Sequence, residues 1–185
     1  MVFTTGSSGR ASLLPPEGQP CGPKPLEETV FVLVRHAHAG NKSHWPGADD
    51  ERPLSPRGRA EALDLARLLT EGGVSSLLSS PALRCLQTLE PAALALGLPV
   101  QPCQELIAEA SAVDLLRLVE SANGTALCTH GETLKTLSAA WAPIWRRLGT
   151  APPDLCGTPK GACWVIERYA TPSATARLVA APARA

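Results

Sequence analysis

His36 and His130 each follow a short apolar segment of this 185-residue chain, residues 30–34 and 125–129. Apolar runs of about five residues without alternation are typical of strands that are buried on both faces of a parallel sheet. Ligands bind such sheets beyond the carboxyl ends of the strands, so both imidazoles should project into one crevice. Either histidine alone could be an ordinary surface or capping residue, but the pair predicts one active site.

Arg84 stands where a helix is expected to begin, because Ser80 and Pro81 have the residue types of an N-cap and a first helical position. The helix macrodipole disfavours a cation in the first turn, so a negative group is expected beside this arginine. A bound phosphate would fill that role, since helix N-termini and guanidinium groups both bind phosphate. A solvated arginine or a salt bridge is the alternative.

Arg35, His36, Arg84 and His130 together suit phosphoryl transfer. A neutral imidazole can attack phosphorus and form a covalent phosphohistidine. Fixed cations can stabilise the charge on the phosphoryl oxygens without a metal ion. We therefore expect a metal-independent reaction that needs no cofactor.

Strand-like and helix-like segments alternate along the chain, which predicts a doubly wound α/β domain. We expect a three-layer α/β/α sandwich with a mostly parallel central sheet. The Ser55-Pro56 pair should begin a helix that Gly72-Gly73 ends, and Ser80-Pro81 should begin another that runs to about Gly97. Further helices are predicted at 113–119 and 132–140, and further strands at 74–78, 164–166 and 176–179.

Composition indicates one globular domain, residues 29–185, after a Gly-, Ser- and Pro-rich segment, residues 1–28, that is predicted to be disordered. The 17 basic and 17 acidic residues balance, so no global charge suggests nucleic acid or an anionic membrane as a partner. There is no run of roughly 20 apolar residues and no apolar signal core, so we expect a cytoplasmic protein. The six cysteines form no Cys-x-x-Cys motif and are expected to be mostly buried thiols. The oligomeric state stays open.

Three ordered segments resemble the signatures of the histidine phosphatase (phosphoglycerate mutase-like) superfamily: Arg35-His36-Ala37, residues 79–88 and Thr129-His130-Gly131-Glu132. Ala37 replaces the usual glycine, a change that members of the SixA type tolerate. The chain looks most like that short branch, and like the phosphatase domain that follows a Nudix domain in some actinobacterial enzymes. This second likeness rests on residues 35–42, 49–54 and 160–164, and the chain holds no Nudix motif.

The resemblance implies a phosphoglycerate mutase-like fold and a role for each matching residue. His36 would be the nucleophile, and the phosphoryl oxygens would be held by Arg35, Arg84 and His130. Glu109 is the candidate general acid, although Glu105 or Glu109 could be a plain surface carboxylate. Lys42 and Arg52 would extend the anion site toward the substrate, or serve only as solvated loop charges. The substrate would be a phosphorylated small molecule or a phosphohistidine protein.

Two rival interpretations remain. A metal site could use His36, His38 and His44, but Arg35 would repel a cation and no acidic or cysteine ligands accompany them. The chain could also be a non-catalytic phosphate-binding module of the same fold. Among substrates, a nucleotide would need a stacking surface, which Trp45 or Trp164 could supply, whereas Trp141 and Trp145 are better explained as core residues.

Overall fold

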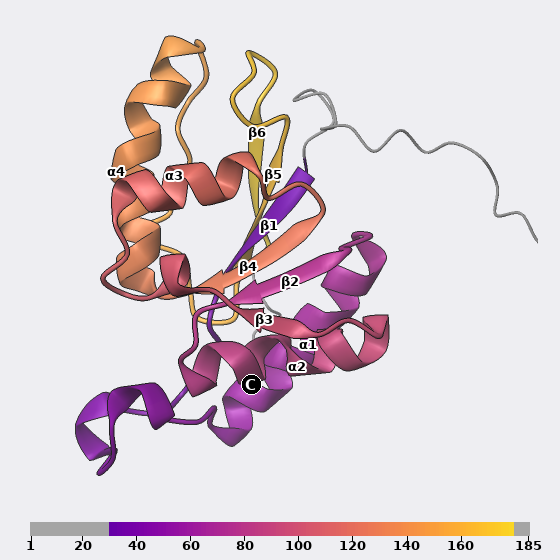
Figure 1. Cartoon of the computed structure of the whole chain (residues 1–185), viewed down its shortest axis with the longest axis vertical. Helices are drawn as coiled ribbons and strands as arrows, with labels where there is room; N and C mark the ends of the chain where they lie inside the picture. The colour runs from indigo at the N-terminus through magenta and orange to yellow at the C-terminus, as the bar shows by residue number, and fades with distance from the viewer. Residues whose placement is uncertain (1–29, 180–185) are drawn as a thin grey trace, which may run out of the picture.

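The structure, a computed structural model, describes residues 30–179, which form a six-stranded sheet with helices on both faces (Figure 1). The strand order is β3-β2-β4-β1-β5-β6. The strands are β1 (Val30–Arg35), β2 (Ser76–Ser79), β3 (Val100–Pro102), β4 (Thr125–Thr129), β5 (Cys163–Glu167) and β6 (Thr175–Val179). The α-helices are α1 (Pro56–Glu71), α2 (Leu83–Leu96), α3 (Ala112–Glu120) and α4 (Gly131–Arg147). Three short 3-10 helices, η2 (Lys42–His44), η3 (Asp49–Glu51) and η4 (Gln104–Leu106), lie in loops.

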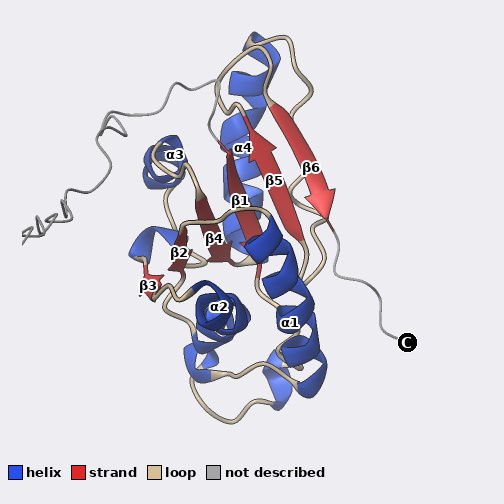
Figure 2. Ribbon diagram, turned by 90° about the vertical axis from the view of Figure 1, so that its right-hand side faces the viewer, coloured by secondary structure: helices blue, strands red, loops and turns tan. Residues whose placement is uncertain are grey.

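The sheet is mixed. Strands β3, β2, β4 and β1 pair in parallel, whereas β5 pairs antiparallel with β1 and with β6. Seen along the sheet, α1 and α2 lie on one side and α3 and α4 on the other (Figure 2). The expected three-layer sandwich with a mostly parallel sheet is confirmed.

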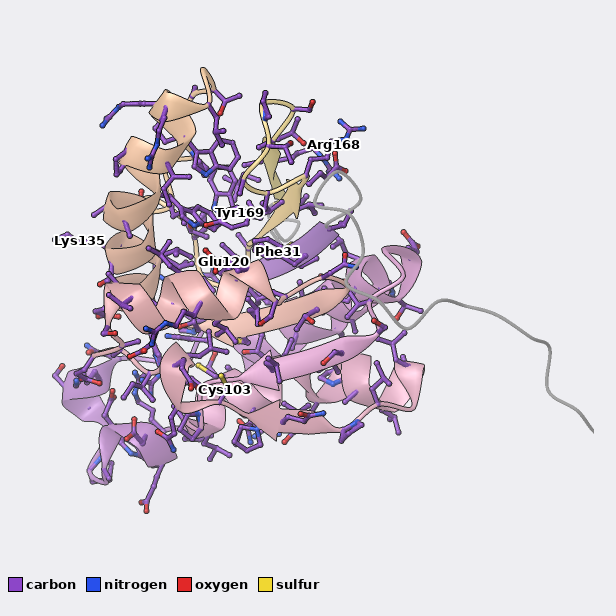
Figure 3. All side chains as sticks on the ribbon, turned by 45° about the horizontal axis from the view of Figure 1, so that its top comes forward. Phe31, Cys103, Glu120, Lys135, Arg168 and Tyr169 are labelled. Atoms are coloured by element: carbon purple, nitrogen blue, oxygen red, sulfur yellow. The ribbon has the colours of Figure 1, made fainter. Side chains whose placement is uncertain are left out.

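Each face of the sheet buries its own apolar core. Helices α1 and α2 cover one face through Leu65, Leu69 and Leu89. On the other face, Trp141 and Trp145 of α4 are buried, which agrees with their predicted core role. The Trp141 indole N–H donates to the Tyr169 hydroxyl at 3.0 Å, and Tyr169 packs edge-on against Phe31 in the interior (Figure 3). These contacts anchor α4 on the strand that precedes His36.

Most predicted elements occur, with shifts at their ends. The helix after Ser55 begins and ends as expected: the Ser55 hydroxyl caps it by accepting from the Gly58 amide, and Gly72 and Gly73 follow its last residue. The helix predicted at 132–140 extends to Arg147, and the strand predicted at 74–78 begins two residues later. Strand β3 is a short edge strand with mostly exposed residues, and no apolar run predicted it.

One expected cap is wrong. Helix α2 begins at Leu83 with Ala82 in the N-cap position, and no side chain caps it. The Ser80 hydroxyl instead contacts the His130 ring, as described below. Arg84 still lies in the first turn of the helix, because the shift of the helix start is small.

The sequence also led to expectations about the cysteines, about membrane-spanning segments and about the N-terminal segment. Cys85, Cys128 and Cys163 are buried free thiols, as expected, whereas Cys156 is exposed. Within residues 30–179 none of the helices has the length and apolar character needed to cross a membrane. The disorder predicted for residues 1–28 concerns a segment that lies outside the described residues.

Candidate active site

Three neighbouring strands deliver the side chains of the candidate site to one edge of the sheet. His36 follows β1, His130 follows β4, and the segment after β2 leads through Ser80 to Arg84. Because β1 and β4 are parallel neighbours in register, the two histidines leave the sheet side by side. Their ring centroids are 5.5 Å apart, and the rings meet edge to face. The two imidazoles therefore share one site, as the strand pattern suggested.

His36 is buried and held in one tautomer. Only 6% of the residue is exposed, and its backbone amide donates to the Thr129 carbonyl at 3.0 Å. Nδ1 lies 2.8 Å from the Ala37 carbonyl oxygen. A carbonyl oxygen can only accept a hydrogen bond, so Nδ1 carries the proton and Nε2 carries the lone pair. Burial lowers the pKa of His36 to about 3, opposed by the Ala37 bond and aided by neighbouring positive groups.

Arg84 is buried at the first turn of α2 and links His130 to an acidic loop. Its Nη2 donates to His130 Nδ1 at 3.2 Å and pairs with the Asp49 carboxylate at 3.2 Å. Its Nη1 donates to the Asp49 carbonyl at 2.6 Å. The salt bridge left open as an alternative for Arg84 is therefore present, and Asp49 supplies the negative charge beside it.

Asp49 is shared by three cations. It accepts from Arg52 Nε at 2.9 Å and lies 3.4 Å from Lys42 Nζ, in addition to its bond with Arg84. Burial alone would raise the pKa of Asp49, but the hydrogen bond from Arg52 and the three positive charges hold it below its usual range. One carboxylate thus neutralises only part of the charge around it.

His130 is held on both ring nitrogens. Because Nδ1 accepts from Arg84, the neutral ring has its proton on Nε2, which lies 2.8 Å from the Ser80 hydroxyl. The Cys85 sulfur lies 3.7 Å from the same nitrogen. The ring position is therefore set by three residues of the segment that follows β2: Ser80, Arg84 and Cys85.

Arg35 lies at the end of β1, against the start of α4. Its Nη1 donates to the Thr158 carbonyl at 2.6 Å. A Cβ on Gly131 would lie only 2.9 Å from Arg35 Nη2, so the glycine leaves room for the guanidinium group. Gly131, at the start of α4, thus leaves space for the arginine at the end of β1.

Arg35 and Arg84 each have a buried Nε–H donor that makes no hydrogen bond within the described residues, 30–179. A buried donor without a partner costs about 1–3 kcal/mol, and more for charged groups. An anion beside these two groups would remove that cost.

Two more residues of the segment 79–88 support the loop after His36. The Thr88 hydroxyl accepts from the Ala37 amide at 3.0 Å and donates to the Arg84 carbonyl at 2.6 Å. The Gln87 side-chain oxygen accepts from the Leu54 amide at 2.9 Å. This segment therefore supplies one arginine to the site and two polar side chains that fix neighbouring loops.

A cavity of about 610 Å³ opens on this site. Its lining includes Arg84, His130, Ser80, Glu109 and Lys42. Glu109 is an exposed residue at the cavity wall, so the structure brings it to the same hollow as the buried groups.

Lys42 and Arg52 differ in their exposure and in the cavities that they line. Lys42 is exposed and lines this cavity, whereas Arg52 is buried and lines a neighbouring one. Arg52 donates to the Ala39 carbonyl and to Asp49, so it is a fixed charge rather than a solvated one.

Two histidines of the alternative metal site, His38 and His44, lie in other surroundings. His38 Nδ1 bonds the Ser55 hydroxyl at 2.7 Å, and His44 is exposed on a 3-10 helix. Between residues 30 and 179 no group of three histidine, cysteine or acidic side chains is arranged to hold a metal ion.

Several functional neighbours were not assigned a role from the sequence. Asp49 and Lys160 stand in loops whose distance to the histidines depends on the tertiary fold, and Ser80 was interpreted as a helix cap. The acidic run at 49–51 carried a usable signal, since a negative group was expected beside Arg84 and a salt bridge was one of the alternatives.

Comparisons with known proteins agree with this geometry. Residues 31–110 match the family model of the histidine phosphatase superfamily (branch 1). This match and the similar proteins described next confirm the resemblance to the histidine phosphatase superfamily that was drawn from the motifs.

Particular relatives can be named. The chain is 32% identical over 150 residues to the 8-oxo-(d)GTP phosphatase of Mycolicibacterium smegmatis, a match that covers 77% of this chain and 45% of that protein. The chain thus spans less than half the length of this relative. Its fold is similar to that of an Agrobacterium tumefaciens protein provisionally assigned as the phosphohistidine phosphatase SixA, with a TM-score of 0.58, 26% identity, and coverage of 76% of this chain and 92% of that one. The tungstate complex of the protein histidine phosphatase SixA shares the fold, with a TM-score of 0.59, 22% identity, and coverage of 82% of this chain and 96% of that one.

Proposed function

We propose that this protein is a phosphatase that transfers a phosphoryl group to His36 and then to water. The observation that supports it best is the presence, in one site, of a neutral, buried imidazole and two guanidinium groups whose Nε–H donors lack partners in the described part of the chain. An imidazole that stays neutral is ready to act as a nucleophile. The two free donors suit phosphoryl oxygens, which accept several hydrogen bonds.

The first step forms one bond and breaks another. The lone pair of His36 Nε2 attacks phosphorus, and the bond from phosphorus to the leaving oxygen breaks with its electron pair. Glu109, in its protonated form, or a water molecule gives the leaving oxygen a proton. Glu109 lines the same cavity as Arg84 and His130, which supports its candidacy. General acid catalysis contributes typically ~10²–10⁴-fold, so its loss slows the reaction without removing the nucleophile.

The second step regenerates the enzyme. Water attacks the phosphorus of the phosphohistidine, and the phosphorus–nitrogen bond breaks with its electron pair returning to His36 Nε2. The proton that the attacking water loses passes to the Glu109 carboxylate or to solvent, and inorganic phosphate leaves. In both steps Arg35, Arg84 and His130 would hold the equatorial oxygens. Donors fixed in place before the reaction stabilise the transition state strongly; removal of one such donor costs about 2.7–4 kcal/mol in well-studied enzymes.

The substrate is proposed as a phosphate monoester, phosphoanhydride or phosphoramidate. The names of the relatives point to a nucleotide or to a phosphohistidine protein. A small hollow of about 260 Å³ beside Arg52 includes Trp45, whose indole N–H is fixed by the Ala48 carbonyl at 2.9 Å. A fixed indole is a suitable stacking surface for a nucleobase, which supports the nucleotide candidate.

The experiment is phosphate release by the purified protein in the presence of EDTA. The panel contains nucleoside di- and triphosphates, sugar phosphates and a phosphohistidine-bearing carrier protein, and His36→Ala is the control variant. We expect turnover that is absent from His36→Ala, and a label from the substrate that is trapped on the wild-type chain in an acid-labile form. Substantial hydrolysis by purified His36→Ala would contradict the proposal, and silence across the panel would favour a non-catalytic binding module.

A further inference from the structure

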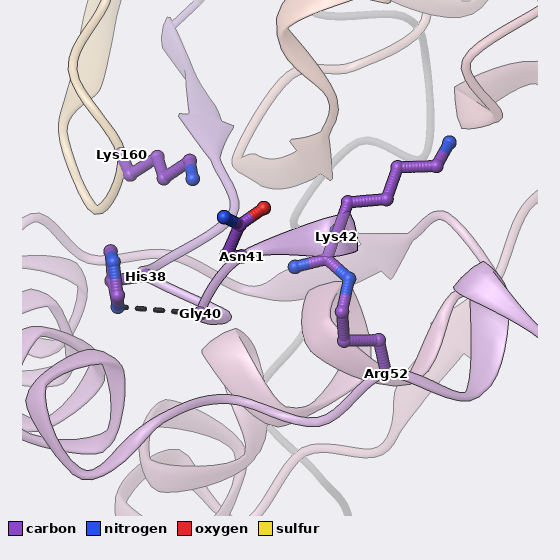
Figure 4. Close-up of a pocket in the computed structure, with 6 residues that line it drawn as sticks. All are labelled: His38, Gly40, Asn41, Lys42, Arg52 and Lys160. Carbon is purple, nitrogen blue, oxygen red and sulfur yellow. Dashed lines mark hydrogen bonds between the residues drawn. The ribbon is translucent and has the colours of Figure 1, made fainter. Parts of the chain in front are cut away.

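A second cavity, of about 570 Å³, lies beside the proposed phosphoryl site and is cationic. Its lining consists of His38, Gly40, Asn41, Lys42, Arg52 and Lys160 (Figure 4). Three of these six residues are lysine or arginine, and none is acidic. Lys42 lines both cavities, so they adjoin one another.

Lys160 is the cation in this cavity that the fold leaves least compensated. Within residues 30–179 it forms neither an ion pair nor a side-chain hydrogen bond. Its pKa is lowered, first by burial and then by the positive charges of Arg35 and Arg52, with Glu61 opposing the change. The protein therefore keeps an amine where its charge is disfavoured in the absence of an anion.

The loop that carries Lys160 is fixed to the backbone of the nucleophile. The Gly161 amide lies 3.2 Å from the carbonyl oxygens of both Arg35 and His36, and the Arg35 amide donates to the Ala162 carbonyl at 3.0 Å. Gly161 has a φ of +74°, and a Cβ there would lie 3.0 Å from the Glu61 carboxylate. The position of Lys160 relative to His36 is thus set by main-chain bonds.

Arg52 supplies a second fixed charge. It is 7% exposed, and its bonds to Asp49 and to the Ala39 carbonyl hold the guanidinium in the cavity wall. Asp49, its only ion-pair partner in the described part of the chain, is shared with Arg84 and Lys42. The positive charge around this cavity is therefore in excess.

We propose that Lys160, Arg52 and Lys42 form a second anion subsite, which selects substrates carrying a second phosphate group in addition to the one transferred. This inference rests on the proposed function, since it places the first phosphate at Arg84 and His130. A phosphoanhydride chain and a bisphosphorylated small molecule both have the required chemistry. Charge-assisted hydrogen bonds from lysine and arginine are well suited to such a group.

Binding to the inactive His36→Ala protein tests the subsite without turnover. Calorimetry at constant ionic strength would compare orthophosphate, pyrophosphate and tripolyphosphate, because salt screens such contacts. We expect tripolyphosphate to bind at least about tenfold more tightly than orthophosphate, and Lys160→Gln added to this background to remove most of that difference. Lys135→Gln is the matched control, because Lys135 is exposed on α4, on the outer side of that helix (Figure 3).

The outcomes separate the two proposals. Equal affinity for the three anions, or an unchanged preference in the Lys160→Gln variant, would overturn the subsite while leaving the phosphoryl site intact. Failure of every anion to bind would count against the proposed function as well as the subsite. In the active protein, two ratios of kcat/KM should each fall about tenfold with Lys160→Gln. The first ratio compares a nucleoside triphosphate with its monophosphate, and the second compares fructose 1,6-bisphosphate with fructose 6-phosphate. A fall in the first ratio alone would identify the phosphoanhydride chain, and equal losses on all substrates would contradict the subsite.

Discussion

His36 donates through Nδ1 to the carbonyl oxygen of the next residue, Ala37, at 2.8 Å. This bond lies within a single turn of chain, and the Ala37 amide is itself fixed by the Thr88 hydroxyl at 3.0 Å. The ring therefore cannot exchange its tautomer without the loss of this bond. Burial keeps the imidazole neutral, and the bond through Nδ1 leaves the lone pair on Nε2.

The low pKa of His36 makes the stability of the fold depend on pH. The pKa of His36 is lowered from 6.5 to about 3, mainly by burial, so between these pH values the unfolded chain binds a proton that the folded chain does not. Stability should fall as the pH falls through this window, by up to about 1.4 kcal/mol per pH unit. Urea unfolding at pH 7.5 and 4.5 measures the effect. The loss should be about 2 kcal/mol smaller in His36→Asn, and an equal loss in both proteins would contradict the assignment.

Arg84→Ala should weaken inhibition by phosphate and by vanadate. The substitution removes one of the two unpartnered donors and the contact with His130 Nδ1. Because hydrogen bonds to charged groups contribute about 1.5–3 kcal/mol each, we expect the inhibition constant to rise about a hundredfold. Arg59→Ala, on the exposed side of α1, is the control. Unchanged inhibition would exclude Arg84 as a ligand of phosphoryl oxygens.

Ser80→Ala should affect activity more than stability. The hydroxyl positions His130 through Nε2, and it does not cap α2. Loss of one hydrogen bond of about 0.5–1.5 kcal/mol should lower kcat/KM by up to about tenfold. Ser55→Ala provides the comparison, because Ser55 does cap a helix, and it should cost about 0.5–2 kcal/mol of stability. If both variants lose only stability, Ser80 has no positioning role.

Gly131→Ala should separate helix stability from activity. Alanine favours a helix over glycine by up to about 1 kcal/mol, and residue 131 begins α4. The added Cβ would lie 2.9 Å from Arg35 Nη2 and must displace that guanidinium. We expect a fold of wild-type or higher melting temperature, with phosphatase activity reduced at least about tenfold.

Gly157→Ala is the matched control for that experiment, since a Cβ there meets no atom of residues 30–179 within 4 Å. It should retain wild-type activity and inhibition by vanadate. Full activity in Gly131→Ala would show that the position of Arg35 is not critical.

The sequence predicted those parts of the site that depend on local pattern. The apolar runs before His36 and His130 located both strands, and the parallel-sheet rule brought the two rings together. Arg84 was placed in a first helical turn although the cap was misassigned, because the helical pattern tolerates a shift of two or three residues.

The parts that were missed depend on contacts between distant loops. Asp49 meets Arg84 across 35 residues, and Lys160 reaches the site through bonds between its loop and the end of β1. Ser80 had the residue type of a cap, but its oxygen lies 2.8 Å from His130 Nε2, 50 residues away, and 3.5 Å from the Ala82 amide. No local periodicity encodes such pairings. Strand β3 was missed because a three-residue edge strand has no buried run to reveal it.

The central place of β4 in the sheet has a consequence for amide hydrogen exchange. All five of its residues are buried, and it is hydrogen-bonded to β2 on one side and to β1 on the other. Amides in such a strand exchange mainly through global unfolding, whereas loop amides exchange through small local openings. The Thr129 carbonyl, at the end of this strand, also holds the His36 amide. We therefore expect the amides of the backbone that carries both histidines to exchange slowly, and those of the loops that carry Lys42 and Arg52 to exchange faster.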